Sequence, residues 1–600
     1  MLEKKTFRVL MIYPEFPPSF WSFQEAVKLM KLKATMPPTG LVTVAAMLPS
    51  QFEVMPIVDL NVEPLLDDLL EKADVVMMTA MIVQKESLRV VIARVKAAGK
   101  TVVVGGPYAT TYSEDVLAMG ADHLVLNEAE QTLEPFVEDF LAGSADRIYD
   151  EKSVAGRSTV QLAVNGKPII TETPTPRWDL LKLHCYSSLA VQFSRGCPFD
   201  CEFCEIPPLF GSTSRTKTPE QMISEFEAVY ATGWRGSIFI VDDNFIGNRR
   251  QVRKLLPVLI EWQKQHGYPF SFFTEGSLDL ANKNMRDIRE GMVAAGFNSV
   301  FGGIESTDPD VLNGRNKGQN GGDLYLKVAC LQNAGLEVTA GFIVGNDKDA
   351  PTVFSDLFRF IQETGIVIAM AGLLTALRGT RLHRRLNSEN RLRAESSGNN
   401  THRFRFNFEP VLDETFLIEG YVNLLERLFE PKNYYARCWT LQRRKGKTTA
   451  GRINGSWIHA TIVVFFRNII KRPNWHFMKF MLLTLLTSPR NMPEAVTQAV
   501  KLEHFMSITK SAVSAHRYPQ KAMTLVELFK ERVSGLQGGV EERIRKTRVL
   551  ERKYRLRALR WYRSLDPHFR SDAKLALVDT MRSIRTHAER IQSQWTGLSY

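Results

Sequence analysis

Strand and helix patterns alternate over the first 380 residues, and this alternation restricts the chain to a few α/β folds. Short apolar runs predict the strands, and longer segments with helical spacing lie between them. Alternating strands and helices build parallel sheets that are covered by helices. The alternation falls into two blocks, residues 1–145 and residues 187–380. We therefore expect two α/β domains in succession, within a chain long enough for roughly three or four domains.

The first block contains five predicted strands, which favour a doubly wound, Rossmann-like sheet. These strands are residues 8–13, 52–58, 73–78, 101–104 and 123–126. Ligands of such sheets bind at the carboxyl ends of the strands. The turns that follow the strands carry small or polar residues that would let a bulky ligand approach the backbone: Thr39, Gly40, Thr79, Gly105, Gly106 and Glu128. A tight strand-to-helix turn without a ligand would explain the two adjacent glycines equally well.

The second block repeats strand then helix six times, which predicts an open, partial (β/α)6 barrel with its site at the carboxyl ends of the strands. The strands are residues 188–194, 237–241, 270–274, 299–303, 338–344 and 366–373. Candidate binding residues lie at the strand ends or in the loop after the first strand: Phe203, Asp243, Glu275, Glu305, Ser306, Gly341 and Gly345. Glu305 could accept the hydroxyls of a ribose, and an adenine could enter an apolar slot beside Phe203. Each residue alone could be structural, but together they predict one pocket.

Three cysteines lie in the loop after the first strand of the second block. Cys197, Cys201 and Cys204 are separated by three and then two residues, and the next histidine is His266. Zinc would want a fourth ligand close by. An iron–sulfur cluster that is held by three thiolates instead keeps one iron open for a substrate or cofactor. We therefore predict a cluster, with a zinc knuckle or chance spacing as the alternatives.

This cysteine spacing, with an aromatic residue just before the last cysteine, resembles the radical SAM superfamily. A five-stranded domain directly before the cysteines resembles the cobalamin-dependent (B12-binding) branch of that superfamily. Further segments resemble the same branch: residues 37–46, 105–107, 242–245, 303–306 and 316–320. Its usual Pro-Gly-Thr after the sixth strand is Arg378-Gly379-Thr380 here, and its Asp-x-His-x-x-Gly loop is missing because the first histidine is His123. The resemblance therefore implies a cobalamin without a histidine lower ligand.

The resemblance implies three cofactors. A 4Fe-4S cluster would be held by the three cysteines, S-adenosylmethionine by the candidate residues of the second block, and cobalamin by those of the first. It implies an enzyme, most often a C-methyltransferase, in which a radical from S-adenosylmethionine opens an unactivated C–H bond that acid–base chemistry cannot open. It also implies an external electron donor of the flavodoxin or ferredoxin type. Non-methylating chemistry, such as cyclisation or rearrangement, remains an alternative, as does an iron–sulfur sensor or RNA-binding protein.

The remaining segments are a connector and a basic helical region. Residues 146–186 predict a linker with a hairpin at Asn165-Gly166. Residues 381–600 predict mainly helices and carry 41 Lys and Arg against 19 Asp and Glu, whereas residues 1–380 carry 36 against 46. The region up to about Trp439 resembles an accessory region of the subgroup that includes hopanoid C-2 methylases. This resemblance points to a hydrophobic lipid or polycyclic substrate.

Two apolar stretches of the basic region allow two interpretations. Residues 457–466 and 477–486 are flanked by Lys and Arg, so they are either buried helices or an interfacial patch on anionic lipid. Residues 541–563 interleave Arg with aromatic residues, which fits RNA binding or, more often, a solvated basic helix. We do not expect a nucleic acid partner. The scattered remaining cysteines and the direct start of the first strand favour a cytoplasmic protein, with peripheral contact at the inner face of the membrane left open.

Overall fold

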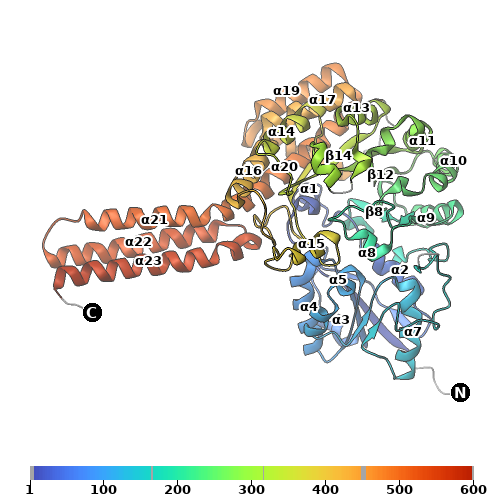
Figure 1. The fold of residues 1–600 in the computed structure, drawn as a ribbon, viewed down its shortest axis with the longest axis horizontal. Coiled ribbons are helices and arrows are strands. Elements are labelled where there is room, and N and C mark those ends of the chain that lie inside the picture. Colours follow the sequence, from blue (N-terminus) through green and yellow to red (C-terminus); the bar gives the residue numbers. More distant parts are fainter. Residues whose placement is uncertain (1–5, 164–165, 315–316, 447–454, 598–600) are drawn as a thin grey trace. The chain divides into compact units, whose positions relative to one another are not determined.

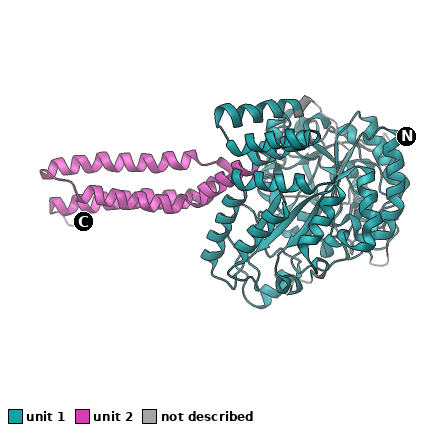
Figure 2. Cartoon of the chain, turned by 90° about the horizontal axis from the view of Figure 1, so that it is seen from above, with its two compact units in different colours: residues 1–401, 405–504 teal, residues 402–404, 505–600 magenta. Residues whose placement is uncertain are grey.

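A computed structural model describes residues 6–163, 166–314, 317–446 and 455–597 of the chain. It contains two compact units, residues 1–401 with 405–504 and residues 402–404 with 505–600 (Figures 1 and 2). The first unit holds both α/β blocks and the first part of the helical region. The second unit consists mainly of three long helices.

The N-terminal sheet has seven strands, all parallel, in the order β2-β1-β4-β5-β6-β7, with β3 paired to β1. The strands are β1 Phe7–Tyr13, β2 Phe52–Val54, β3 Val58–Asp59, β4 Val75–Thr79, β5 Thr101–Gly105, β6 His123–Val125 and β7 Ile148–Tyr149. The predicted strand at residues 52–58 is two strands, because Pro56 lies between them and has no N–H to donate. The seventh strand comes from the segment that was expected to be only a connector. The predicted hairpin turn at Asn165 lies outside the described residues.

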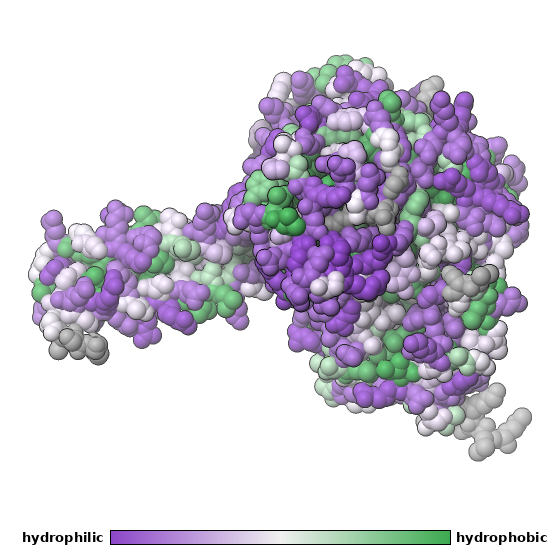
Figure 3. Space-filling view, viewed as in Figure 1, coloured by the Kyte–Doolittle hydropathy of each residue, from purple (hydrophilic) through white to green (hydrophobic). Residues whose placement is uncertain are grey.

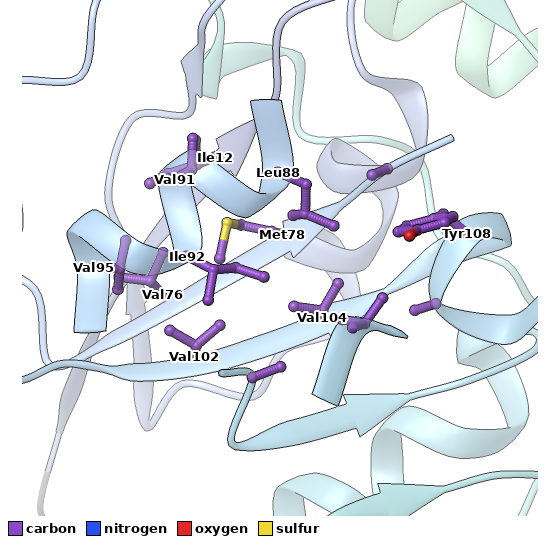
Figure 4. Packing of buried hydrophobic residues seen from close by; sticks show 14 of the residues in the cluster. Ile12, Val76, Met78, Leu88, Val91, Ile92, Val95, Val102, Val104 and Tyr108 are labelled. Atoms are coloured by element: carbon purple, nitrogen blue, oxygen red, sulfur yellow. The ribbon is translucent and has the colours of Figure 1, made fainter. Parts of the chain in front are cut away.

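Helices cover both faces of this sheet, as the alternating pattern predicted. They include α2 Thr39–Met47, α4 Lys85–Ala97, α5 Gly106–Thr111, α6 Ser113–Ala118 and α7 Ala129–Ala142. Figure 4 shows how α4 packs: its apolar side chains, spaced at i, i+3, i+4 and i+7, meet apolar side chains of β1, β4 and β5. The residues of this contact that belong to α4 are Leu88, Val91, Ile92 and Val95. These buried apolar contacts stabilise the sheet. They therefore hold the turns at the carboxyl ends of its strands in place.

The second block forms the predicted six-stranded parallel barrel, and its strand order β15-β14-β13-β12-β11-β8 follows the sequence. The strands are β8 Ser188–Val191, β11 Ser237–Ile240, β12 Ser271–Glu275, β13 Phe297–Glu305, β14 Glu337–Val344 and β15 Ala369–Leu373. The first and last strands do not pair, so the barrel is open. Helices α9 Pro219–Ala231, α10 Arg249–Gln265, α11 Arg286–Ala295, α13 Leu324–Ala334 and α14 Val353–Thr364 follow its strands (Figure 1).

The rest of the first unit is helical, as expected. Its helices are α15 Arg381–Ser388, α16 Glu414–Leu428, α17 Pro431–Arg444, α18 Gly455–Phe466, α19 Trp475–Thr487 and the first part of α20 Met492–His516. A five-residue π-helical turn, Arg467–Lys471, continues α18. Among the helices of the described ranges, none is long and apolar enough to cross a membrane.

The second unit is a bundle of α21 Tyr518–Ser534, α22 Val540–Ser564 and α23 Arg570–Thr596 (Figure 2). Its core includes Phe529, Tyr554 and Ile584, with Trp561 packed against it. The aromatic side chains of the basic segment 541–563 therefore serve the core of the bundle. This packing favours the solvated basic helix over an RNA-stacking surface, because stacking on bases needs exposed rings.

Candidate functional site

Two aspartates at the end of β11 hold the start of the cysteine loop. Asp242 accepts the backbone N–H groups of Phe193 and Ser194 at 2.8 and 2.9 Å, and the Ser194 hydroxyl at 2.7 Å. Asp243 accepts the N–H of Gly196 at 2.8 Å. Gly196 has φ +90°, and a Cβ there would lie 2.6 Å from a backbone oxygen, so only glycine fits. Four hydrogen bonds therefore position the loop before its first cysteine.

The three predicted cluster cysteines lie between β9 (Ser194–Arg195) and α8 (Ile206–Phe210) as free thiols. Burial, together with the charges of Cys201 and Cys197, raises the pKa of Cys204 to about 12. Two donors point at the sulfurs: the Ile206 N–H lies 3.5 Å from Cys204 Sγ, and Gln319 Nε2 lies 3.6 Å from Cys201 Sγ. Such donors stabilise thiolates and tune a cluster.

The cysteine loop fits a cluster better than a single metal ion. Within the described residues, no three His, Cys, Asp or Glu side chains are grouped tightly enough for one ion. A cluster joins each thiolate to a different iron, so its ligands stand further apart than those of one zinc. Three thiols of one short loop, whose charges act on one another and two of which accept hydrogen bonds, suit the donor set that leaves one iron open.

Aromatic rings on the inward face of the barrel strands remain partly exposed. On β12, Phe272 is fully buried and its ring lies 5.4 Å from Phe226 of α9, so it faces the helices. Its neighbour Phe273 faces the opposite way, remains partly exposed, and stacks on Phe239 of β11 at 4.7 Å. Phe301 of β13 is likewise partly exposed. In a filled barrel the inward side chains pack in layers, so this pattern indicates interior space for a ligand.

Charged side chains gather at the carboxyl end of this interior. Lys317 Nζ lies 3.0 Å from Glu305 Oε1 and 5.7 Å from the centre of the Phe203 ring. Burial and the charges of Asp243 and Glu305 together raise the pKa of Glu275 to about 8, against the opposing charge of Lys317. With all groups ionised, the three carboxylates and one ammonium would carry two net negative charges. This arrangement suits a ligand with positive groups.

Two glycines make room for this cluster, and two predicted residues lie apart from it. A Cβ at Gly303 would lie 2.3 Å from Glu305 Oε1, and one at Gly341 would lie 3.2 Å from the Phe301 ring. Gly345 instead donates its N–H to Asp349 at 2.7 Å, and a Cβ there would lie 2.3 Å from Phe406. Ser306 accepts the N–H of Asp308 at 3.1 Å. Phe203, Asp243, Glu275, Glu305 and Gly341 thus come together, whereas Ser306 and Gly345 have local structural contacts.

Glu128, which was predicted to contact cobalamin, is engaged by two arginines. Its Oε2 lies 2.6 Å from Arg195 and 2.9 Å from Arg215, and its Oε1 lies 2.8 Å from Arg215. Arg195 also contacts Glu130 at 3.1 Å. The Glu128 side chain is 1% exposed. Its geometry assigns this carboxylate to the junction between the sheet and the cysteine loop, and it leaves no free oxygen for a cofactor.

The other turn residues lie at the carboxyl edge of the N-terminal sheet. Gly106 has φ +86°, and a Cβ there would lie 2.0 Å from Thr79 Oγ1, so the turn itself requires this glycine. A Cβ at Gly105 would lie 2.8 Å from a backbone oxygen, whereas Gly40 has no atom within 4 Å of its Cβ position. Gly40 therefore borders open space. Thr39 donates its hydroxyl to a backbone oxygen of β8 at 3.3 Å.

This edge of the sheet faces the barrel. Tyr112, which follows α5, accepts the N–H of Arg378 at 3.4 Å, and the Arg378 guanidinium lies 4.7 Å from the centre of the Tyr112 ring. Tyr186, just before β8, donates its hydroxyl to Asp59 at 2.9 Å. The carboxyl ends of β3, β5 and β6 are thus connected to the strands and loops of the barrel. The two predicted ligand edges lie opposite each other within one compact unit.

Sequence reasoning did not assign roles to Lys317, Gln319, Arg195 or Arg215. Lys317 lies in a segment that was noted only for its resemblance, and a buried lysine cannot be recognised from its neighbours in sequence. The two arginines lie 67 and 87 residues from their partner Glu128. Contacts over such distances follow from the packing of two domains, which no local pattern encodes.

Comparisons with known proteins agree with this organisation. Residues 27–137 match the B12 binding domain, residues 191–361 match the radical SAM superfamily, and residues 380–517 match a domain of unknown function, DUF4070. An uncharacterized methyltransferase of Synechocystis sp. is 39% identical over 505 residues, 83% of this chain and 91% of that protein. The hopanoid C-2 methylase of Rhodopseudomonas palustris is 34% identical over 387 residues, 64% of this chain and 71% of that protein.

Solved structures show the same fold. The cobalamin-dependent S-adenosylmethionine radical enzyme OxsB, with aqua-cobalamin and S-adenosylmethionine bound, gives a TM-score of 0.53 at 14% identity over 85% of this chain and 80% of its own. The radical S-adenosylmethionine methyltransferase TsrM of Kitasatospora setae, with cobalamin and a [4Fe-4S] cluster bound, gives a TM-score of 0.52 at 14% identity over 82% and 99%. At this identity, the likeness concerns the fold.

The family relationship follows from the relatives that span most of their own length. It confirms the predicted architecture and the three predicted cofactors, and it extends beyond residue 440, where the resemblance in sequence was expected to end. The relatives are methyltransferases, which supports an enzyme and argues against the alternative of an iron–sulfur sensor. The chain belongs to the cobalamin-dependent radical SAM methyltransferase family, whose cofactors are a 4Fe-4S cluster, S-adenosylmethionine and cobalamin.

Proposed function

We propose that this enzyme methylates an unactivated carbon of a hydrophobic lipid or polycyclic substrate. The observation that carries the proposal is the aromatic interior of the open barrel, where Phe239, Phe273 and Phe301 remain partly exposed beside the carboxylate cluster. Apolar rings exclude water and bind apolar surface. The similarity to a hopanoid C-2 methylase supports a lipid substrate. When bound, the cluster and S-adenosylmethionine supply a radical that removes a hydrogen atom, and cobalamin supplies the methyl group.

We assign roles at the S-adenosylmethionine end of the barrel by charge. Cys197, Cys201 and Cys204 would hold the cluster. Glu275 and Glu305 face the interior and match the positive ammonium and sulfonium groups of S-adenosylmethionine. Lys317, which lies beside Glu305 and the Phe203 ring, would bind its carboxylate. Asp243 acts through the cysteine loop, since its carboxylate accepts the N–H of Gly196.

We assign the cobalamin contacts to the carboxyl edge of the N-terminal sheet. Thr39, Gly40, Thr79, Gly105 and Gly106 lie at the turns of that edge, and Gly40 borders open space. His123 is the first residue of β6, which places it at the opposite, amino edge, where its ring contacts the backbone oxygen of Asp146 at 2.6 Å. This position supports a cobalamin without a histidine lower ligand.

We infer a cytoplasmic enzyme that receives electrons from an acidic flavodoxin or ferredoxin. The six cysteines are all free thiols, as expected in a reducing compartment. Arg381 is 46% exposed and pairs with Asp200 inside the cysteine loop, so a basic side chain lies at the surface beside the predicted cluster. Because Asp200 neutralises Arg381, the charge that would steer an acidic donor would come from Arg384, which is exposed on the same helix. Cyclisation or rearrangement remains the second candidate reaction, since the same cofactors serve it.

A deletion strain tests the proposed methylation. Lipid extracts of the strain should lack a compound of the parent and accumulate one that is about 14 Da lighter, the mass of one CH₂ group. The wild-type gene should restore the compound, and a Cys201→Ala gene should not. A compound that changes without a 14 Da step would favour the second reaction. Unchanged extracts of both lipids and soluble metabolites would refute both candidate reactions in that strain.

A further inference from the structure

Helices α18 and α19 are apolar on two faces, although only one face of each is buried. Ala460, Val464, Phe477 and Phe480 are at most 2% exposed and pack inward. The opposite faces carry large apolar side chains that are 43% to 71% exposed, and we call these the apolar face: Ile458, Ile462, Phe466, Ile469, Ile470, Trp475, Leu482, Leu485 and Leu486. A helix that is apolar all round is normally buried in protein or lipid. The sequence allowed either buried helices or an interfacial patch. The first interpretation describes the inward face of each helix, and the second describes the exposed face.

The apolar face is continuous rather than scattered. Its first residues recur every three or four positions, which places them in one stripe along α18 and the π-helical turn. A groove of about 210 Å³ joins this stripe to α19. The groove is lined only by apolar side chains: Phe465, Ile469, Phe477, Met478, Met481, Leu482, Leu485 and Met492. Figure 3 shows apolar surface at the upper edge of the molecule, where α19 lies in Figure 1. Contiguous exposed apolar surface marks an interaction site.

The charge around the apolar face is mainly positive, although Glu503 of α20 pairs with Arg467 of the π-helical turn at 3.4 Å. Residues 431–493 contain 12 Lys and Arg and not one Asp or Glu. Lys471 and Arg472 lie where α18 ends and α19 begins, both are exposed, and no carboxylate of the described residues lies within ion-pair distance of them. Arg490 is exposed just after α19. An apolar surface that is bordered by cations complements a membrane with anionic headgroups.

We propose that the apolar face lies in the headgroup region of an anionic lipid bilayer and holds the enzyme at the membrane. The charges argue against a second copy of this chain, because it would bring its own basic border to the contact while residues 431–493 offer no carboxylate to pair with those cations. The exposed aliphatic side chains argue against RNA, which would meet cations and polar groups instead. The proposal deepens the proposed function, since a lipid substrate would be concentrated at the same surface. Binding to vesicles nevertheless does not depend on the methylation reaction.

Co-sedimentation of the full chain with vesicles tests the proposal. We would compare phosphatidylglycerol–phosphatidylcholine vesicles with pure phosphatidylcholine vesicles, at low and high salt. We expect binding to the anionic vesicles only, weakened by salt because headgroup attraction is screened. In Lys471→Gln/Arg472→Gln protein, the partition coefficient should fall about 25-fold, because each cation near the surface contributes about fivefold.

Two apolar variants separate insertion from charge attraction. Leu486→Asn protein should lose at least about tenfold in binding at any salt concentration. Leu326→Asn is the matched control, since Leu326 of α13 is 68% exposed against 71% for Leu486 and lies outside the apolar face. The control should bind as the wild type does. Both changes are at exposed positions, and circular dichroism should confirm that the variants remain folded.

A depth measurement gives an independent readout. Trp475 is 68% exposed on the apolar face, so lipids brominated on the acyl chain should quench part of the tryptophan fluorescence in wild-type protein. This part should disappear in Trp475→Phe protein. The proposal is overturned if neither vesicle binds, or if binding is insensitive to all of these substitutions. Variants that only convert an oligomer to a monomer, without any vesicle binding, would instead assign the apolar face to a second copy.

Discussion

Replacing Glu275 by glutamine tests whether the barrel interior holds carboxylates for a cationic ligand. Glu275 lies at the end of β12, and its pKa is raised to about 8 by burial and by Asp243 and Glu305. Glutamine keeps the shape of the side chain and removes the charge. We therefore expect Glu275→Gln to stabilise the cofactor-free protein, and to weaken its binding of S-adenosylmethionine once the cluster is present.

The pH dependence of the stabilisation follows from the direction of the pKa shift. Between pH 4.5 and about 8, the unfolded chain has released the Glu275 proton while the folded protein retains it. The unfolded state then binds fewer protons, so stability falls as the pH rises through this window and levels off above it. At about 1.36 kcal/mol per pKa unit, the charge costs up to about 2 kcal/mol at pH 6 and about 5 kcal/mol at pH 9. Since the side chain keeps some solvent contact, we expect about half of these values.

Thermal melting of the cofactor-free protein at pH 5, 6 and 9 measures the effect. The melting temperature of Glu275→Gln should exceed that of the wild type by a margin that grows with pH. Glu172→Gln is the control, because Glu172 is exposed and should leave the melting temperature unchanged at every pH. A margin that stays constant or shrinks toward pH 9 would refute the reasoning about the carboxylate cluster.

The remaining predictions concern the cluster, the junction and Lys317. Cys201→Ala protein should fail to develop iron–sulfur absorbance on reconstitution, whereas Cys185→Ala protein should develop it normally; equal absorbance in both would contradict the cluster assignment. Glu128→Gln should destabilise the protein by about 3–5 kcal/mol, because it leaves Arg215 buried and unpaired, and an unchanged urea midpoint would count against a buried ion pair. Lys317→Met should weaken S-adenosylmethionine binding about 10- to 100-fold in equilibrium dialysis, with unchanged iron content, and unaltered affinity would remove Lys317 from the site.

The fold was predictable from the sequence wherever a single strand or helix produces a recognisable pattern of apolar residues. The six barrel strands were predicted within a few residues, because each buried parallel strand is a short apolar run. The sheet of the first domain was predicted with two strands too few. Strand β7 has only two residues and pairs with β6, and so short a strand carries no pattern of its own.

The candidate site was predictable only as far as its chemistry is local. Three cysteines within eight residues indicate a metal cluster by their spacing alone. The role of Glu128 could not be predicted, because its position after a strand suggests a ligand contact while its partners, Arg195 and Arg215, come from another domain. The sequence also could not predict which side of α18 and α19 is exposed. Their composition shows that both helices are apolar, but not which face the rest of the fold leaves uncovered.

The partly exposed rings inside the barrel have a thermodynamic consequence for the enzyme without its cofactors. Inward-facing rings that stay partly exposed contribute less to the free energy of unfolding than they would in a filled core. A ligand that binds only the folded state raises the free energy of unfolding by mass action. The increase is about 4 kcal/mol when the ligand concentration is 1,000 times the dissociation constant. Each cofactor that binds the folded protein should therefore raise the melting temperature, and protein made during iron or cobalamin shortage should be the first to unfold and be degraded.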